Sequence, residues 1–268
     1  MLAMHQMSID LKKYLQNHNQ LTWKERIRIT FEIIRALYFI HKEKAIHRDL
    51  HSGNILYSQF HDSWKISDLG FCGPADKPTK SIYGNLPYIA PEVIAGKGYT
   101  YKSDIYSIAM LMWEISSGQP PFINYKHDNY ELAIDIINGM RPKIGSGIPL
   151  EYKSLMEQCW NADPLNRPDI NTLWKQVANL HLLYNKSNEN NKNKKFKNFF
   201  KNSKLLQLFK PKTNNNLEIN QTSSLETNNT NSILFTSKVH QFENIPEPRN
   251  ATEGEYHLFY FKITRHTN

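Results

Sequence analysis

One polar segment concentrates the side chains that could do chemistry, His47-Arg48-Asp49-Leu50-His51-Ser52-Gly53-Asn54. It holds a carboxylate, Asp49, and an amide, Asn54, and a second carboxylate, Asp68, follows 14 residues after the amide. Carboxylate and amide oxygens suit hard cations such as Mg²⁺, and a carboxylate can also accept a proton. Taken alone, the segment has an ordinary alternative interpretation as a polar loop that follows a helix.

Four further motifs follow in a fixed order, and together they argue against an ordinary polar loop. The polar segment matches the pattern H-R-D-x-x-x-x-N of a kinase catalytic loop. The others are Asp68-Leu69-Gly70, Ala90-Pro91-Glu92, Ser103-Asp104-Ile105-Tyr106-Ser107 and the run from Cys159 to Pro168, C-W-N-A-D-P-L-N-R-P. Coincidence is negligible for five matches in this order. The chain resembles the C-terminal lobe of a protein kinase over about residues 1–183, nearest the tyrosine kinases and the tyrosine-kinase-like Ser/Thr kinases.

The resemblance implies phosphoryl transfer from ATP, with Mg²⁺, to a hydroxyl of a protein substrate. Such transfer is mostly positioning and charge neutralisation. By resemblance, Asp49 holds the acceptor hydroxyl and takes its proton. Asn54 and Asp68 are the implied cofactor-binding residues that hold Mg²⁺ against the phosphates, and Leu56 is the apolar floor under the adenine.

The resemblance also implies a regulatory site around Arg48. This guanidinium stands where kinases receive a phosphate carried by the activation segment, and we count it with the catalytic group. The candidate phosphate acceptors in that segment are Thr79, Ser81 and Tyr83.

Three more residues have implied structural roles. Glu92 and Arg167 resemble a buried ion pair, and Asp104 resembles the carboxylate that braces the backbone of the catalytic loop.

Several positions depart from the family pattern. His51, which we include in the predicted catalytic group, stands where Ser/Thr kinases carry a Lys that neutralises the γ-phosphate, and a histidine is about neutral at pH 7. Asn85 replaces a Thr that lies near the catalytic loop, and it can still hydrogen-bond Asp49. Leu69 replaces Phe and can still pack next to His47. The tyrosine-kinase pattern at 50–54 is not met either, so the acceptor residue stays open.

The resemblance begins at the hinge, near residues 1–7. A Gly-rich loop, a V-A-I-K-like strand and a Glu-bearing helix do not precede the catalytic loop in this sequence. Because these parts hold the ATP phosphates, we expect the chain to be truncated and inactive by itself. Three hypotheses remain: part of an active kinase, a non-catalytic kinase-like interaction module, or a product that does not fold stably.

The elements that must position these residues can be predicted from local patterns. Thr22 and Glu25 form a capping box for a helix that runs to about His41, after a shorter helix near 8–15. Two short strands, 55–57 and 64–67, flank the motifs. Ser103 is the expected N-cap of a buried helix that ends before Gly118. Further helices are expected near 128–138, 150–160 and 169–183. The fold class is mainly α with a small, two-stranded β element, followed by a disordered tail.

The tail holds the charge. The chain has a net charge of +8, of which residues 1–184 carry +2, residues 185–231 carry +6 and residues 232–268 carry none. We divide the chain into a kinase C-lobe (1–183), an Asn/Lys-rich linker (184–231) and a tail of unknown structure (232–268), with a β-like run at Tyr256–Ile263.

The lysines interleaved with apolar residues at 192–210 allow two interpretations. One is a solvated linker, and the other is a basic amphipathic helix in weak contact with anionic membranes. We expect no nucleic-acid partner, because no aromatic platform or recognition motif accompanies the charge.

The location follows from three weak signals. The chain has two cysteines, which cannot build a disulfide framework. Its N-terminus lacks a basic region followed by an apolar run, and its apolar stretches are shorter than the about 20 residues of a membrane span. We expect an intracellular, cytoplasmic protein.

Overall fold

The computed structural model describes residues 9–18, 20–74, 82–125, 128–186 and 236–264. The helices are α1 (Leu11–Asn17), α2 (Trp23–Lys42), α3 (Pro91–Ile94), α4 (Tyr101–Ser117), α5 (Asn129–Ile137), α6 (Leu150–Cys159), α7 (Ile170–Lys186) and α9 (Glu253–Thr264). The strands are β1 (Ile9–Asp10), β2 (Ala45–Ile46), β3 (Ile55–Ser58), β4 (Ser63–Ile66), β5 (Gly73–Pro74), β6 (Ile82–Gly84) and β7 (Lys238–His240). Helices dominate, as the sequence predicts.

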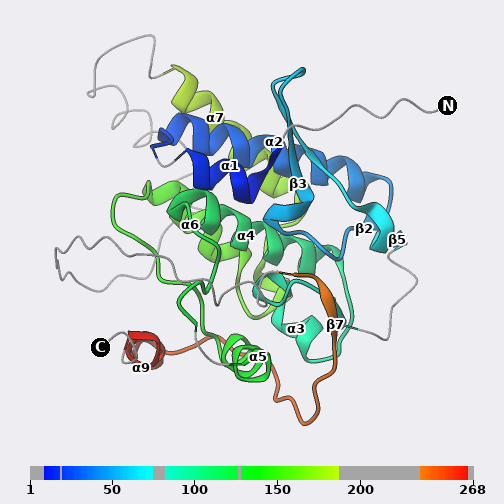
Figure 1. The fold of residues 1–268 in the computed structure, drawn as a ribbon, viewed down its shortest axis with the longest axis vertical. Coiled ribbons are helices and arrows are strands. Elements are labelled where there is room, and N and C mark those ends of the chain that lie inside the picture. Colours follow the sequence, from blue (N-terminus) through cyan, green and yellow to red (C-terminus); the bar gives the residue numbers. More distant parts are fainter. Residues whose placement is uncertain (1–8, 19, 75–81, 126–127, 187–235, 265–268) are drawn as a thin grey trace.

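Helix α4 is the centre of the fold. Thirteen of its seventeen residues, Ser103 to Ile115, are buried. In Figure 1, α1, α2 and α7 lie above α4 and α6, and α5 lies below them. The buried apolar residues of these helices form one core cluster. Helix α4 is apolar nearly all round because other elements pack against it on several sides.

Helix α2 confirms the predicted capping box. The Thr22 hydroxyl accepts from the backbone N–H of Glu25 (3.3 Å), and the Thr22 N–H donates to the Glu25 carboxylate (2.8 Å). Along the helix, Ile27, Ile34 and Leu37 are fully buried. These contacts place the C-terminal end of α2 beside the loop that follows β2.

The predicted start of α4 is wrong by three residues. Thr100, not Ser103, is the N-cap, because its backbone is extended (φ −136°, ψ 171°) and its hydroxyl accepts from Lys102 and Ser103 N–H. Ser103 is the third helical residue and completes the capping box through its own hydroxyl. The predicted end is confirmed, since Gly118 caps the helix with φ 75°.

The small β element has one more strand than expected. β3 and β4 form the predicted hairpin, with Ile55 opposite Ile66. β1 adds a third strand on the other side of β3, with Ile9 opposite Tyr57. Two further pairs, β2 with β5 and β6 with β7, are also antiparallel. The sequence pattern of 8–15 indicated a helix alone, because two strand residues are too few to show an alternating period.

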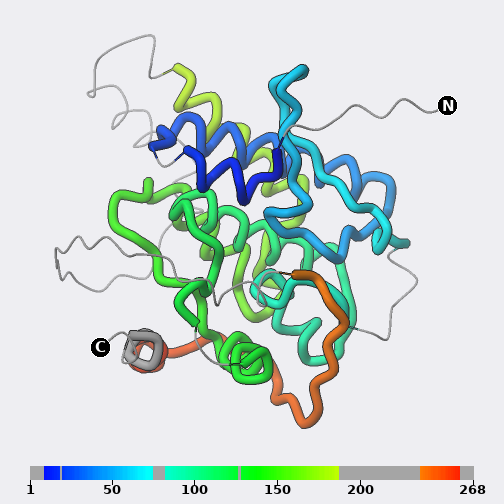
Figure 2. The backbone as a smooth tube through the Cα atoms, in the orientation of Figure 1, coloured from blue at the N-terminus to red at the C-terminus, as the bar shows by residue number. Residues whose placement is uncertain are grey.

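The expected disordered tail is corrected only at residues 236–264, which contain a strand and a helix. Residues 236–250, which we call the strap, run from β7 beside α3 and under α5 toward α9 (Figure 2). The run Tyr256–Ile263, expected to be β-like, lies in α9, which follows a capping arrangement between Thr252 and Glu255 (2.9 Å). The Asn/Lys-rich linker from residue 187 onward, and with it the predicted membrane contact of residues 192–210, lies outside the described residues.

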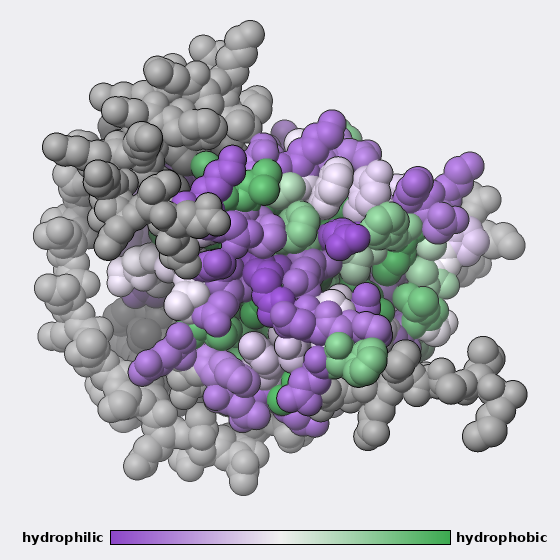
Figure 3. Space-filling view, turned by 90° about the horizontal axis from the view of Figure 1, so that it is seen from above, coloured by the Kyte–Doolittle hydropathy of each residue, from purple (hydrophilic) through white to green (hydrophobic). Residues whose placement is uncertain are grey.

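The surface seen from above is mostly hydrophilic, with several separate hydrophobic patches (Figure 3). Exposed large apolar side chains include Phe39, Phe60 and Leu69, and scattered residues of this kind are ordinary on a protein surface. Within the described residues, every helix is too short or too polar to cross a bilayer.

Candidate active site

The loop after β2 is held from beneath by Asp104 of α4. Its carboxylate accepts from the backbone N–H of His47 (2.9 Å) and of Arg48 (3.0 Å), and it also bonds His41 Nε2 (2.8 Å). Asp104 is buried, so these bonds replace the water that the carboxylate loses. The predicted bracing role of Asp104 is confirmed.

His47 joins this loop to the segment that ends at Asp68. Its Nδ1 accepts from the backbone N–H of Asp49 (3.3 Å), which places the ring proton on Nε2. Nε2 therefore donates to the backbone carbonyl of Ser67 (3.0 Å). Because His47 is fully buried, the two polar segments are fixed to each other through one ring.

The hairpin brings Asn54 and Asp68 to the same end of β3 and β4. The backbone N–H of Ser67 donates to the Asn54 carbonyl (2.8 Å), and the Asn54 amide nitrogen donates to the Asp49 carbonyl (2.9 Å). Three predicted site residues, Asp49, Asn54 and Asp68, are thus tied into one constellation. Asp68 has a left-handed backbone (φ 57°) and an exposed carboxylate.

The side chains of Asn54 and Asp68 carry oxygen donors of the kind that Mg²⁺ prefers. The Asn54 nitrogen is engaged with Asp49, which leaves the amide oxygen for a cation. The Asp68 carboxylate makes a weak contact with the Gly70 N–H (3.4 Å). In the described residues no cluster of three His, Cys, Asp or Glu side chains could hold a metal, so an ion at Asn54 and Asp68 would complete its six oxygen ligands from water and phosphate.

Asp49 is an ionised carboxylate in a nearly dry position. It is 3% exposed. Burial by itself raises a carboxyl pKa, but the nearby His51 ring and the hydrogen bond from Ser237 outweigh burial and hold the pKa of Asp49 below its ordinary value. Asp49 is therefore a hydrogen-bond acceptor at neutral pH.

A serine hydroxyl from the strap is hydrogen-bonded to the Asp49 carboxylate. Ser237 Oγ donates to Asp49 Oδ1 over 2.9 Å. His51 Nδ1 accepts from the Gly53 N–H (3.1 Å), so its proton is on Nε2, which lies 3.1 Å from Ser237 Oγ and donates to it. The chain of bonds runs from His51 through Ser237 to Asp49. Sequence analysis missed Ser237, because no local motif marks a serine 188 positions away.

The remaining predicted site residues lie around this centre. Leu56 is half-buried on β3, on the face opposite the buried Ile55. Arg48 has a positive φ (73°) and donates from Nη2 to the carbonyl of Pro74 (3.1 Å). Its guanidinium thus lies at the start of the activation segment.

Of the candidate acceptors in that segment, Thr79 and Ser81 lie outside the described residues. Tyr83 belongs to β6, and its ring stacks on Phe71 at 3.6 Å between centroids.

One expectation about the departures from the family pattern is wrong. Asn85 is buried without a bond to Asp49, and its amide oxygen has no partner among the described residues. The close neighbour of Asp49 is Gly84 instead, where an added Cβ would lie 3.2 Å from Oδ1 at a φ of +138°. Leu69 is 56% exposed, and its expected packing next to His47 stays a prediction.

The predicted ion pair between Glu92 and Arg167 is confirmed. Two guanidinium nitrogens each lie 2.7 Å from a carboxylate oxygen, and the Arg167 side chain is fully buried. Arg167 also donates to the carbonyls of Asn161 and Lys102. The pair joins α3 to the segment between α6 and α7, below the loop that carries the site.

Comparisons with known proteins agree with this arrangement. The family model described as "Protein kinase domain" matches residues 1–181. The dual specificity protein kinase zakA of Dictyostelium discoideum is 32% identical over an alignment of 192 residues that covers 66% of this chain and 24% of that protein. The probable serine/threonine-protein kinases gdt4 and roco7 of the same organism are 34% and 30% identical, over 68% and 66% of this chain and 12% and 7% of their own lengths.

A mainly helical fold with this loop, hairpin and ion pair, matched over residues 1–181, defines the class. The chain belongs to the protein kinase family. Members of this family generally use ATP and Mg²⁺ and act on protein substrates. The chain spans about a quarter or less of the length of the three relatives named above.

Proposed function

We propose that this chain provides the acceptor-binding and magnesium-binding half of a protein kinase site, in which ATP transfers its γ-phosphoryl group to a protein hydroxyl. Residues 1–183 would be the larger lobe of the kinase domain. The observation that carries the proposal is the hydroxyl of Ser237 on Asp49, 2.9 Å from Oδ1. It supports a site that can hold an alcohol with its proton directed at a carboxylate.

The chemistry of each residue follows from its place. Asp49 orients the acceptor hydroxyl and takes its proton as the oxygen attacks the γ-phosphorus. Asn54 and Asp68 would hold Mg²⁺, which neutralises charge on the phosphates when it is bound. His51, which donates to Ser237 Oγ in the structure, would donate a hydrogen bond to the acceptor oxygen. Leu56 would form the apolar surface under the adenine, and Arg48 would bind a phosphate carried by the activation segment.

A short acceptor side chain fits this geometry. Strand β7 pairs with β6 through Lys238 and Gly84, and one residue earlier the side chain of Ser237 already reaches Asp49. At the same backbone position, the phenol oxygen of a tyrosine would extend several ångströms beyond the carboxylate. The names of the relatives, serine/threonine and dual specificity kinases, also support Ser or Thr as the acceptor.

The test uses the full chain with Mg·ATP and dephosphorylated casein as the probe. We expect phosphate transfer that Asp49→Asn lowers by about 10²–10⁴-fold, the usual contribution of a general base. Asp163→Asn is the matched control, because this carboxylate is exposed and remote in sequence from the loop.

Transfer that is unchanged in Asp49→Asn would disprove the role of Asp49. The absence of any transfer by the chain would favour the second candidate function, a non-catalytic kinase-like interaction module. His51 in place of the phosphate-neutralising lysine favours that alternative.

A further inference from the structure

The strap joins the site by adding a strand to the activation segment. Ile82 lies opposite His240, Tyr83 opposite Val239 and Gly84 opposite Lys238. The Tyr99 hydroxyl bonds both the backbone N–H and the carbonyl of Tyr83. Tyr83 is therefore engaged on the far edge of β6, which leaves Ile82 and Gly84 to form the hydrogen bonds with β7. Addition of an extended segment to a strand edge is a common way to bind a peptide.

The register of β7 places a hydroxyl next to Asp49, the proposed general base. Ser237 directly precedes β7, and its Oγ donates to Asp49 Oδ1 (2.9 Å) while it lies 3.1 Å from His51 Nε2. The neighbouring hydroxyl, Thr236, is exposed. The pairing of β6 with β7 therefore determines that Ser237, and not Thr236, reaches the Asp49 carboxylate.

Contacts beyond Ser237 hold the register. His240 is buried, its Nε2 donates to the Gly84 carbonyl (3.0 Å), and its ring stacks on Phe242. Lys97, in the loop after α3, forms an ion pair with Glu247. None of these contacts involves Ser237, so the strap does not depend on Ser237 for its position.

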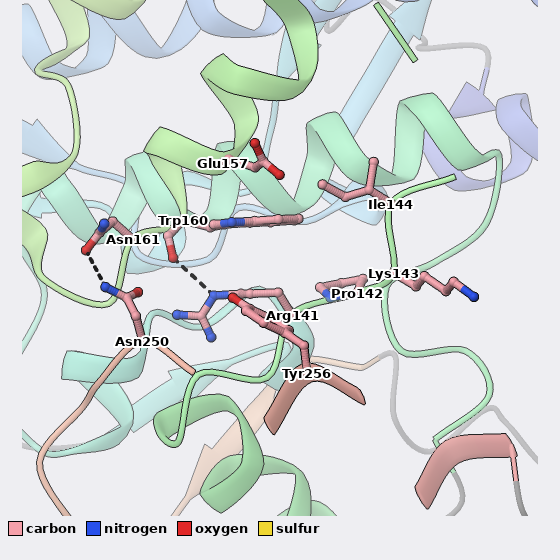
Figure 4. Close-up of a pocket in the computed structure, with 9 residues that line it drawn as sticks. All are labelled: Arg141, Pro142, Lys143, Ile144, Glu157, Trp160, Asn161, Asn250 and Tyr256. Carbon is pink, nitrogen blue, oxygen red and sulfur yellow. Dashed lines mark hydrogen bonds between the residues drawn. The ribbon is translucent and has the colours of Figure 1, made fainter. Parts of the chain in front are cut away.

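The far end of the strap is anchored between α5 and α6 (Figure 4). Asn250 donates to Asn161 Oδ1 (3.2 Å) and accepts from the Ala162 N–H (2.9 Å). The N–H of Arg249 donates to the Ile137 carbonyl (3.0 Å). Close approach is possible because residue 139 is a glycine, where an added Cβ would lie 2.1 Å from the nitrogen of Ala251.

We propose that the strap docks in the site for the acceptor protein, with the Ser237 hydroxyl in the position of the hydroxyl that receives the phosphoryl group. Ser237 is then a modification site of this chain, and the site of the same molecule phosphorylates it. The inference rests on the proposed function for its chemistry, but the docking itself is a statement about binding.

Phosphoryl transfer to Ser237 exchanges one bond at phosphorus for another. Ser237 Oγ forms a bond to the γ-phosphorus of Mg·ATP, the bond to the bridging oxygen breaks, and ADP leaves with that electron pair. The Oγ proton passes to Asp49. The product is a phosphoserine with a charge of about −1.5 to −2 at pH 7, held against the carboxylate of Asp49 once that proton is lost. Like charges repel at this distance, so we expect phosphorylation to loosen the strap and open the site.

The first experiment tests docking without catalysis. In the full chain with Cys72→Ser, cysteines replace Tyr83 and Val239, which face each other as a non-hydrogen-bonded pair, where Cα atoms are about 4.5 Å apart and a disulfide fits. The matched control replaces Tyr83 and Glu243. We expect rapid crosslinking of the first pair alone. Equal crosslinking of both pairs, or of neither, would overturn the inference whatever the activity.

A measurement on the unsubstituted chain guards against loss of folding in the variants. Hydrogen exchange should show protection of the backbone amides of His240 and Ile82, which form ladder bonds in this pairing. Exchange at the rate of an unstructured peptide in both would contradict docking.

The second experiment maps phosphate after incubation with Mg·ATP and dephosphorylated casein. We expect phosphate on Ser237, with a first-order rate constant that does not change on dilution, and loss of that signal in Ser237→Ala but not in Thr236→Ala. Phosphate on casein with none on Ser237 would overturn the inference and leave the proposed function standing. Phosphate on neither would count against the proposed function, and the crosslinking result then decides the inference by itself.

Discussion

The hydroxyl of Ser237 donates to Asp49 Oδ1 over 2.9 Å, although 188 positions separate the two residues. The contact joins the strap to the loop that carries the predicted general base. It also explains part of the low pKa of Asp49, because a hydrogen bond to the ionised carboxylate stabilises that form. A hydroxyl from within the same chain is therefore hydrogen-bonded to the Asp49 carboxylate.

Gly139→Ala should release the far end of the strap. The added Cβ would lie 2.1 Å from the backbone nitrogen of Ala251, and the residue has a φ of +98°. We expect hydrogen exchange at the His240 amide to accelerate by about tenfold or more, as local opening becomes easier. The matched control is Gly145→Ala, since an added Cβ there meets no atom within 4 Å. Equal exchange in both variants would contradict this anchor.

Glu92→Gln should destabilise the fold strongly. It leaves the fully buried Arg167 guanidinium without its carboxylate, and loss of one partner of a buried pair costs about 3–5 kcal/mol of unfolding free energy. Urea unfolding measures the change. The control is Glu157→Gln, whose ion pair with Lys153 is exposed and 3.8 Å long, with an expected cost under about 1 kcal/mol. Similar costs for the two variants would contradict the buried pair as a stabilising contact.

Glu114 should make stability depend on pH. Burial raises the pKa of this carboxyl to about 7, and the Tyr88 hydroxyl donates to it (2.6 Å). Between pH 4.5 and 7 the unfolded carboxyl is ionised while the folded one keeps its proton, so stability falls as the pH rises through this window.

The size of this effect is about 3 kcal/mol, from about 2.5 pH units at 1.36 kcal/mol each. Urea unfolding from pH 4 to pH 8 would measure it, with Glu114→Gln as the comparison, because the amide does not titrate. The plots of unfolding free energy against pH should differ in slope between the unsubstituted protein and Glu114→Gln. Parallel stability curves would show that Glu114 titrates normally.

Asp104→Asn should loosen the loop that carries Asp49. The carboxylate accepts from two backbone N–H groups, of His47 and Arg48, whereas an amide presents an NH₂ group to one of them. A buried donor without a partner costs about 1–3 kcal/mol. We expect this loss of unfolding free energy together with faster exchange of the His47 and Arg48 amides. A stability loss without faster exchange at these two amides would place the effect elsewhere, for example at His41.

Local patterns in the sequence were sufficient for much of the fold. The capping box at Thr22 predicted the start of α2, and Gly118 marked the end of α4, because both signals act within a few residues. Asp49, Asn54 and Asp68 could be named from motifs that resemble those of protein kinases. The start of α4 was missed because both Thr100 and Ser103 are good caps, and the choice between them depends on backbone conformation.

The sequence by itself determined six helices, from α1 to α7 without α3, and the hairpin, since these depend on short-range signals. It also named the residues of the constellation, through motifs that resemble those of protein kinases. The tertiary structure alone decided which distant side chain bonds to Asp49. A serine in a polar tail has no local signal for its partner, and the pairing of β6 with β7 is a long-range contact between segments about 155 residues apart. The close approach at Gly139, the bond between Ser237 and Asp49 and the helical state of α9 all depend on where the strap packs.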